Sequence, residues 1–134
     1  MAYIWNPALE TGHKKIDEQH KQLFDALNNI ADAFNKGNSA EELLKIIGFL
    51  TEYTIVHFAT EEELQIKYNY PGYKAHKQSH EDFKVTVGEL TQRFLTEEPG
   101  KELVQDVTMT IGDWLISHIR VDDIRMAKFI KDNE

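Results

Sequence analysis

Three short segments that combine Gly or Pro with polar residues divide this chain into four long stretches. The segments are "NKGNS" (35–39), "YNYPGY" (68–73) and "EEPG" (97–100), and this composition marks turns. The stretches between them are rich in helix formers, and their apolar residues recur every three or four positions, as on one face of an α-helix. Short connections make consecutive helices antiparallel neighbours. The sequence therefore predicts an all-α fold, an antiparallel up-down-up-down four-helix bundle with an N-terminal arm and a short C-terminal helix, over residues 1–134 as a single domain.

Local signals support this prediction. Ser39 followed by Glu42 has the pattern of a capping box that opens the second helix. The alternation of apolar and polar residues that a half-buried β-strand requires is absent. Near the N-terminus, Tyr3, Ile4 and Trp5 form an apolar arm that we expect to pack along the bundle, with a partner-binding patch as the alternative.

Composition and charge exclude several classes of function. The chain has no cysteine, which rules out disulfides, thiolate catalysis and cysteine-ligated zinc or iron–sulfur clusters. Its net charge of −8 argues against nucleic acid and against an anionic membrane surface as partners. No run approaches the roughly 18 apolar residues of a membrane span, and "MAYIWNPALE" lacks the basic flank and apolar run of a signal peptide. We therefore expect no nucleic-acid and no membrane partner, and a cytoplasmic location.

Each predicted helix has one inward-facing line of residues, which we call its seam. The four seams comprise Ile16, His20, Leu23, Leu27, Ile30 and Phe34; Leu43, Ile47, Leu50, Thr54, His57, Glu61 and Leu64; Tyr73, His76, His80, Phe83, Val87, Leu90 and Phe94; and Val104, Val107, Ile111, Trp114 and His118. Apart from Thr54, the seams are apolar except where they carry histidine or glutamate. Five of the six histidines in the chain, together with Glu61, are thus predicted to point into the bundle.

Buried imidazoles and carboxylates require partners. A buried polar group without a hydrogen bond costs on the order of 1–3 kcal/mol, and an unpaired carboxylate costs more. A single such histidine is best explained as a core residue bonded to a backbone carbonyl, but five on four converging seams favour metal coordination. No serine or cysteine lies on the seams, so a catalytic triad is a poor alternative. Imidazole nitrogen and carboxylate oxygen suit Fe, Zn, Mn, Ni or Cu.

Spacing indicates which residues could share an ion. His57 and Glu61 lie one helical turn apart, as do His76 and His80. The last acidic candidates follow His118 in "HIRVDD". Asp122 is four residues on and would share the face of His118 in a regular helix. Asp123 is five residues on, about 140° around the axis, so the helix would have to break or bulge for it to be a ligand. Spacing alone slightly favours Asp122.

Five imidazoles are too many for one ion that also keeps an open position. Two adjacent ions bridged by Glu61 and one aspartate fit better. If two six-coordinate ions share two carboxylates and one bridging oxygen, three histidines complete one ion, whereas two histidines leave the other with one vacancy. Such an asymmetric pair is a ligand-binding site.

In their order along the chain, these residues resemble the hemerythrin family, and specifically its single-domain bacterial members, the bacteriohemerythrins. The resemblance spans "IDEQH" (16–20), "HFATEE" (57–62), "YPGYKAHKQSH" (70–80) and "WLISHIRVDD" (114–123). An HxxxE or HxxxH motif alone is common, but the ordered set is specific. The resemblance implies an antiparallel four-helix bundle around a non-haem di-iron centre, an oxo- or hydroxo-bridged pair of iron ions.

Carried over residue by residue, the resemblance implies that His76, His80 and His118 hold the coordinatively full iron. His20 and His57 would hold the iron with the vacancy, and Glu61 and Asp123 would bridge the two. Asp123 is preferred to Asp122 here because the family places its aspartate five residues after the last histidine. The implied chemistry is reversible binding of O2 as a hydroperoxide at the two-histidine iron.

A carrier must keep water and reductants away from bound oxygen, so its pocket should be apolar and closed. Phe58, Trp114, Leu115 and Ile119 flank the ligands and could form that wall, although ordinary core packing explains Trp114 equally well. A histidine-rich ligand set, with few anionic groups, is expected to suit O2 binding better than O2 cleavage.

Two positions depart from the family pattern. His13 follows Gly12 where the family usually has isoleucine; it lies off the seam and is expected to be exposed. Gln65 stands where the family usually has methionine. Pointing inward, its amide could hydrogen-bond the bound ligand or admit water and speed autoxidation; pointing outward, which we expect, it is a surface residue.

The leading prediction is a non-enzymatic protein that carries, stores or delivers O2. One alternative is a sensor of O2, redox state or iron, which would require a separate partner chain, since no second domain is evident. Another is a di-iron enzyme acting on peroxide or nitric oxide. Sustained turnover would need a docking site for an electron donor, which the sequence does not reveal. A purely structural metal site is disfavoured by the predicted vacancy.

Overall fold

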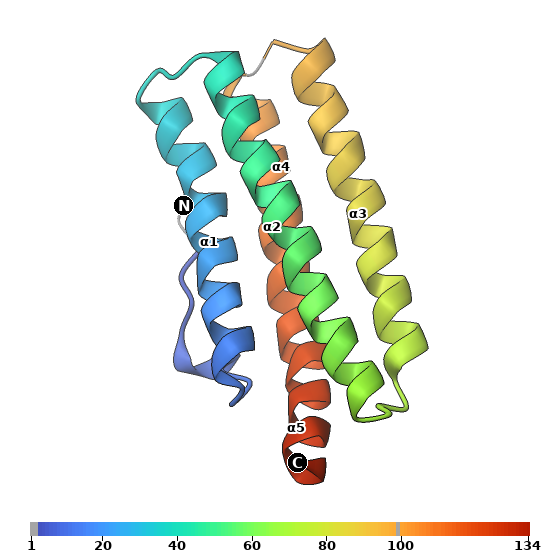
Figure 1. The fold of residues 1–134 in the computed structure, drawn as a ribbon. Coiled ribbons are helices and arrows are strands. Elements are labelled where there is room, and N and C mark those ends of the chain that lie inside the picture. The colour runs from blue at the N-terminus through green and yellow to red at the C-terminus, as the bar shows by residue number, and fades with distance from the viewer. Residues whose placement is uncertain (1–2, 99) are drawn as a thin grey trace.

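A computed structural model describes residues 3–98 and 100–134. Its elements are η1, a 3-10 turn (Pro7–Leu9), α1 (Lys14–Asn35), α2 (Ala40–Lys67), α3 (Tyr73–Thr96), α4 (Lys101–His118), η2, a π-helical turn (Ile119–Asp123), and α5 (Ile124–Asn133). Helices α1 to α4 run alternately up and down, and α5 continues α4 beyond the lower end of the bundle (Figure 1). The described ranges contain no strand. The predicted four-helix bundle, with its arm and C-terminal helix, is confirmed.

The helices end where the sequence places turns. Gly37, just beyond α1, has φ of +81°, a left-handed conformation that glycine adopts without steric cost. Its N–H donates to the Phe34 carbonyl at 3.0 Å, and the next N–H, of Asn38, donates to the Ala33 carbonyl at 3.0 Å. The capping box of Ser39 and Glu42 is present at the start of α2. These local bonds satisfy backbone groups that a helix end otherwise leaves unpaired.

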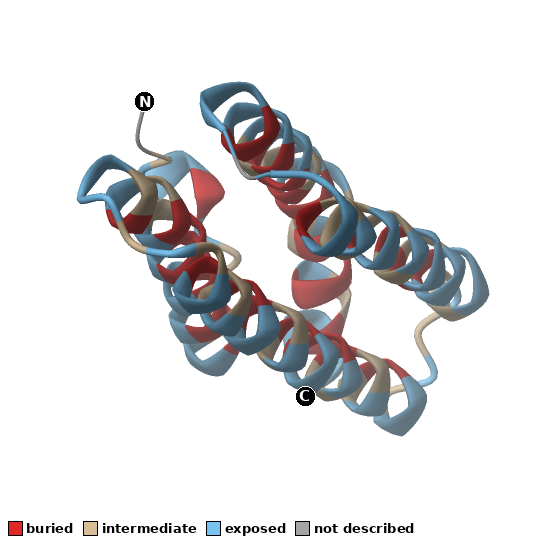
Figure 2. Ribbon diagram, turned by 90° about the horizontal axis from the view of Figure 1, so that it is seen from above, coloured by how far each residue is buried: buried red, intermediate tan, exposed pale blue. Residues whose placement is uncertain are grey.

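The core lies along the inward faces of the four long helices, and Figure 2 shows their buried residues facing one another. Most seam residues are fully buried, as predicted. Those that are only half-buried are Phe34, Leu64, Tyr73, Leu90 and Trp114. On α2 the buried line ends at Gln65 in place of Leu64.

The N-terminal arm packs across α1 and α4. The Tyr3 N–H donates to the Asn28 side-chain oxygen at 2.8 Å, and the Asn28 amide donates to the Tyr3 carbonyl at 2.7 Å. The Tyr3 ring lies over Gly112, where an added Cβ would come within 2.3 Å of it. Farther along, Leu9 is buried in the core, and η1 contacts η2. Of the predicted arm, Tyr3 and Trp5 pack against the core as expected, whereas Ile4 is 74% exposed.

Among the described helices, only α2 is long and apolar enough to cross a membrane by length and composition. It packs against α1 and α3 and presents His57 and Glu61 to the interior. The length and apolar composition of α2 are also those of a core helix in a helical bundle.

Candidate metal centre

Seven buried side chains from all four long helices and the π turn converge in the interior of the bundle. They are His20, His57, Glu61, His76, His80, His118 and Asp123, each at most 4% exposed. Their ligand atoms form two sets that could each hold an ion, one with three histidines (His76, His80, His118) and one with two (His20, His57). Glu61 and Asp123 belong to both sets.

In the three-histidine set, each imidazole turns its Nε2 atom toward the carboxylates. His76 Nε2 lies 3.2 Å from Glu61 Oε1 and 3.0 Å from Asp123 Oδ1. His80 Nε2 lies 3.1 Å from Glu61 Oε1, and His118 Nε2 lies 3.1 Å from Asp123 Oδ1. This set therefore uses one oxygen of each carboxylate.

The two-histidine set uses the other oxygen of each carboxylate. His57 Nε2 lies 3.1 Å from Glu61 Oε2. His20 Nε2 lies 2.9 Å from Asp123 Oδ2 and 3.6 Å from Glu61 Oε2. Glu61 and Asp123 thus each present one oxygen to one set and one to the other, which is how a carboxylate bridges two ions.

The spacing of the donor atoms fits metal coordination. His118 Nε2 lies 3.0 Å from His76 Nε2 and 3.1 Å from His80 Nε2. Metal–nitrogen bonds of about 2.1 Å at right angles place two ligand atoms about 3.0 Å apart. Glu61 Oε2 and Asp123 Oδ1 are buried without a well-formed hydrogen bond, although imidazole nitrogens lie close to both. Such orphaned acceptors, facing a common centre, are accounted for by a cation. The residues present therefore fit a pair of metal ions.

The π-helical turn η2 brings Asp123 to this position. Its wider coil contains one more residue per turn than an α-helix would, and it closes with the Ile124 N–H donating to the Ile119 carbonyl. Asp123 is buried in the cluster as a result, whereas Asp122 lies beside the ring of His118, with Oδ2 2.9 Å from Nδ1. The helix therefore bulges between His118 and Asp123, and Asp122, which the spacing of a regular helix slightly favoured, lies outside the cluster.

Burial and ion pairing act against each other in this cluster. Burial lowers the pKa of His20 and of His76, but hydrogen bonds to Asp123 and Glu61 outweigh it and raise both pKa values to about 9. Burial raises the pKa of both carboxyls, and the neighbouring histidines overcome it, so that the pKa values of Glu61 and Asp123 lie below their usual range. The raised pKa values of His20 and His76 and the lowered pKa values of Glu61 and Asp123 therefore have one cause, the pairing of these groups with one another.

The outward-facing Nδ1 atoms of three imidazoles have defined partners. His57 Nδ1 lies 2.7 Å from Gln19 Oε1. His80 Nδ1 lies 2.8 Å from Glu62 Oε2. His118 Nδ1 contacts Asp122, and the Ser79 hydroxyl lies 3.3 Å from the same atom. With Nδ1–H bonded outward, Nε2 keeps its lone pair for the centre of the cluster.

Comparison with known proteins identifies the family. The model of the "Hemerythrin HHE cation binding domain" matches residues 11–130. The chain belongs to the hemerythrin family. It is 35% identical to a bacteriohemerythrin of Pseudomonas aeruginosa (strain LESB58), over 96% of this chain and 87% of that protein. It is 30% identical to the myohemerythrin of Sipunculus nudus, over 92% of this chain and 89% of that protein. A solved wild-type hemerythrin superimposes with a TM-score of 0.84 at 30% identity, covering 95% of this chain and 96% of that one.

Two of the four predicted wall residues stack on histidines of the cluster. Phe58 stacks on the ring of His80, with centroids 3.8 Å apart and planes 3° apart. Trp114, which is half-buried, stacks on His118 at 4.3 Å. Leu115 and Ile119 are buried in the main core. All four therefore lie in the main core or pack against it, and their role as an O2 pocket stays a prediction.

Gln65 is buried, so the expectation of a surface residue is wrong. Its side chain is 0% exposed, and its amide nitrogen lies 2.9 Å from the sulfur of Met126. Its Oε1 atom has no hydrogen-bond partner. The reason is that α2 keeps its inward face for one more turn beyond Glu61, where α5 covers it.

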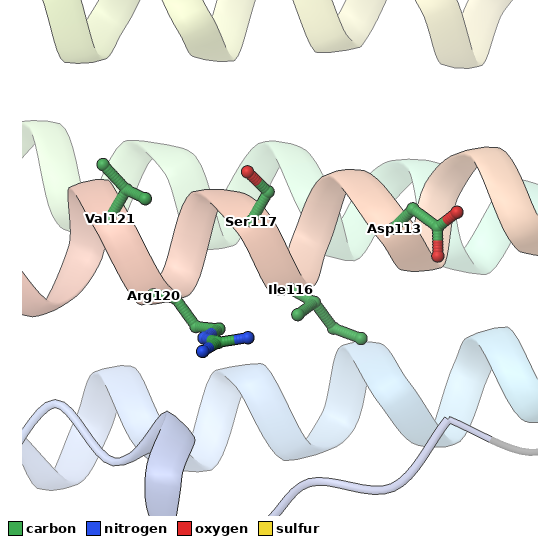
Figure 3. A pocket seen from close by; sticks show the side chains of 5 residues that line it. All are labelled: Asp113, Ile116, Ser117, Arg120 and Val121. Carbon is green, nitrogen blue, oxygen red and sulfur yellow. The ribbon is translucent and has the colours of Figure 1, made fainter.

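Two other features lie outside the cluster. His13 is half-buried and not exposed, because it caps α1: its Nδ1 accepts the Ile16 N–H at 3.4 Å. A surface hollow on the outer side of α4 and η2 is lined by Asp113, Ile116, Ser117, Arg120 and Val121, and Ile116 and Arg120 extend toward α1 (Figure 3). None of these residues belongs to the cluster.

Gln19 and Glu62, which contact the outer nitrogens of His57 and His80, were not predicted from the sequence, and Asp122 was considered only as a ligand. Gln19 precedes a seam histidine, Glu62 follows the seam glutamate, and Asp122 precedes the cluster aspartate. A residue next to a ligand along the chain lies about 100° around the helix, where neighbouring helices meet. A polar residue directly before or after a predicted ligand in the sequence is therefore a candidate for orienting a ligand, and this rule would have identified all three.

Proposed function

We propose that the chain binds O2 reversibly at a non-haem di-iron centre and acts in the cytoplasm as a carrier or store. Three histidines, Glu61 and Asp123 would hold one iron; two histidines and the same two carboxylates would hold the other. The observation that carries the proposal is that each carboxylate offers one oxygen to each histidine set. The bound iron pair would supply the electrons and the open coordination position for O2.

The chain's own residues prepare this chemistry. Glu61 and Asp123 are fully buried anions that fix the separation of the two sets. Gln19 holds the proton of His57 on Nδ1, so that Nε2 faces the interior. Phe58 and Ile119, each at most 1% exposed, keep bulk water from the imidazoles. A dry surrounding favours reversible binding over irreversible oxidation.

The asymmetry of the two sets supports binding over a structural role. Each position would receive one oxygen from each of the two carboxylates. The position with two histidines therefore has one protein ligand fewer than the position with three. An open position is what separates a reactive site from a closed structural one. Membership of the hemerythrin family supports the same conclusion.

The deciding experiment is an oxygenation cycle. Protein loaded with ferrous iron is kept anaerobic, exposed to O2 and then purged, while iron stoichiometry and the visible spectrum are followed. Two irons per chain and an absorption band that appears with O2 and disappears on purging are expected. Immediate, irreversible oxidation would instead indicate a sensor or an enzyme, and failure to bind two irons would contradict the site.

A matched pair of variants tests the two-histidine position. His57→Leu removes one of its two nitrogens, and we expect it to abolish the reversible band, because the open position loses a ligand. His13→Leu removes the sixth histidine, which lies outside the cluster, and should leave the band unchanged. Equal oxygenation of both variants would refute the assignment of the open position.

A further inference from the structure

The two histidine sets differ in what supports their imidazoles from behind. In the three-histidine set, His80 and His118 each place Nδ1 against a carboxylate, at 2.8 Å from Glu62 and 2.9 Å from Asp122. In the two-histidine set, His57 faces the neutral amide of Gln19, and His20 Nδ1 is buried without a partner. The carboxylates that contact the outward-facing Nδ1 atoms therefore lie on the three-histidine side of the cluster.

This difference changes the imidazoles as ligands. A carboxylate that accepts the Nδ1 proton forms a charge-assisted bond and draws that proton away from the ring. The ring becomes more electron-rich, and its Nε2 atom becomes a stronger donor to a cation. A neutral amide orients the ring without adding charge. Two of the three imidazoles on one side are thus strengthened, whereas neither imidazole on the other side is.

We propose that Glu62 and Asp122 are positioning residues that act through His80 and His118 to make the three-histidine position the tighter of two metal positions. The two-histidine position, lacking such support, remains weakly held and open to an external ligand. This proposal rests on the proposed di-metal function. It gives a second cause, besides the number of histidines, for the different affinities of the two positions.

The two carboxylates are not equivalent. The Glu62 side chain is 15% exposed and that of Asp122 is 37% exposed, so solvent screens Asp122 more strongly. The hydroxyl of Ser79, 3.3 Å from His118 Nδ1, can also replace Asp122 as a partner. We therefore expect Glu62 to contribute more than Asp122.

A cobalt titration tests the proposal without oxygen chemistry. Co²⁺ takes the same nitrogen and oxygen ligands as ferrous iron. Metal-free protein is titrated anaerobically with Co²⁺ and followed by calorimetry and visible absorption, which should resolve a tight and a weak step in the wild-type chain. Glu62→Gln should weaken the tight step by about tenfold and the weak step by less than about threefold. Asp122→Asn should produce a smaller loss in the same step.

The chain offers a matched control for charge. Glu63 lies next to Glu62, is exposed, and bonds to none of the histidines in the described parts of the chain. Glu63→Gln changes the net charge by the same amount, and both binding steps should stay as in the wild type. Equal losses in Glu62→Gln and Glu63→Gln would overturn the proposal.

A reciprocal variant tests the proposal by strengthening metal binding at the two-histidine position. Gln19→Glu places a carboxylate behind His57. The Thr60 hydroxyl, which now accepts from the Gln19 amide at 3.1 Å and donates to the Val56 carbonyl, can turn its proton to that carboxylate. The weak step should tighten by about tenfold, while the tight step stays unchanged. An unchanged weak step in folded Gln19→Glu protein would count against the proposal even if Glu62→Gln proved unstable. Failure of the wild-type chain to bind two Co²⁺ would instead contradict the proposed function.

Discussion

Gln65 is a buried amide beside a small apolar cluster formed by residues of α1 and α5. It lies one turn beyond Glu61, and Met126, to which its amide nitrogen donates, packs with Ile16 and Ile130. Sulfur is a weak acceptor, and the Oε1 atom of Gln65 has no partner at all. A buried carbonyl in this state costs on the order of 1–3 kcal/mol. Such a cost, beside a site that must stay dry, suggests that this polar group has a functional consequence.

Replacing Gln65 with methionine should stabilise the protein and prolong oxygenation. Gln65→Met removes the unsatisfied carbonyl while keeping a similar volume, so urea unfolding of metal-free protein should show a gain of about 1 kcal/mol. The iron-loaded variant should also autoxidise more slowly, because its surroundings exclude water better. Gln105→Met, on the exposed side of α4, is the control and should change stability by less than about 0.5 kcal/mol. A destabilised Gln65→Met protein would mean that the carbonyl is satisfied in solution.

At the scale of elements, the continuous α4–η2–α5 segment places two adjacent aspartates in different roles. The π turn directs Asp123 into the cluster and leaves Asp122 behind the ring of His118. Neither glycine nor proline occurs within Ile119–Asp123, so no helix breaker forces the turn. Interactions of Asp123 with His20, His76 and His118 instead compensate for the irregular hydrogen bonding.

Substitution of the two aspartates should therefore have unequal effects on metal stoichiometry. Asp123→Asn replaces a carboxylate that both proposed metal positions share, so fewer than two Co²⁺ should bind per chain. Asp122→Asn leaves both positions formed, and two Co²⁺ should still bind, one of them more weakly. Cobalt content after desalting measures both, with far-UV circular dichroism as the check on folding. Loss of stoichiometry in Asp122→Asn alone would show that the helix is regular in solution.

At the scale of the whole molecule, the four-helix bundle could be predicted because the sequence patterns that specify it lie within single turns and single helices. Turn segments such as 35–39 and the period of the seams specify where helices lie and which face is buried. The seven cluster residues were predicted as ligands in the same way, except that Asp123 required the family resemblance, because a π turn leaves no local signal. Gln65 and the supporting residues Gln19 and Glu62 depend on how neighbouring helices are rotated against each other, which a single helix's periodicity does not determine.

The cluster also couples the stability of the whole bundle to pH. In the metal-free protein, the pKa values of His20 and His76 are raised from 6.5 to about 9, because their bonds to Asp123 and Glu61 outweigh burial. The folded state then binds these protons more tightly than the unfolded chain does. Their contribution is complete below pH 6.5 and is lost as the pH rises toward 9. The lowered pKa values of the two carboxyls give a contribution that is present above their ordinary values of 4.5 and 3.8 and lost in acid.

The metal-free protein should accordingly be most stable between about pH 4.5 and 6.5 and lose a few kcal/mol between pH 6.5 and 9. Urea unfolding of chelator-treated protein across this range measures the slope. His76→Gln should flatten the slope above pH 6.5, since one of the two raised groups is gone. His13→Gln removes a histidine outside the cluster and should keep the wild-type slope. Metal-loaded protein should not lose stability between pH 6.5 and 9, because bound cations replace the protons on the imidazoles. A metal-free protein whose stability rose toward pH 6.5 and then stayed level up to pH 9 would show that burial keeps the histidines neutral.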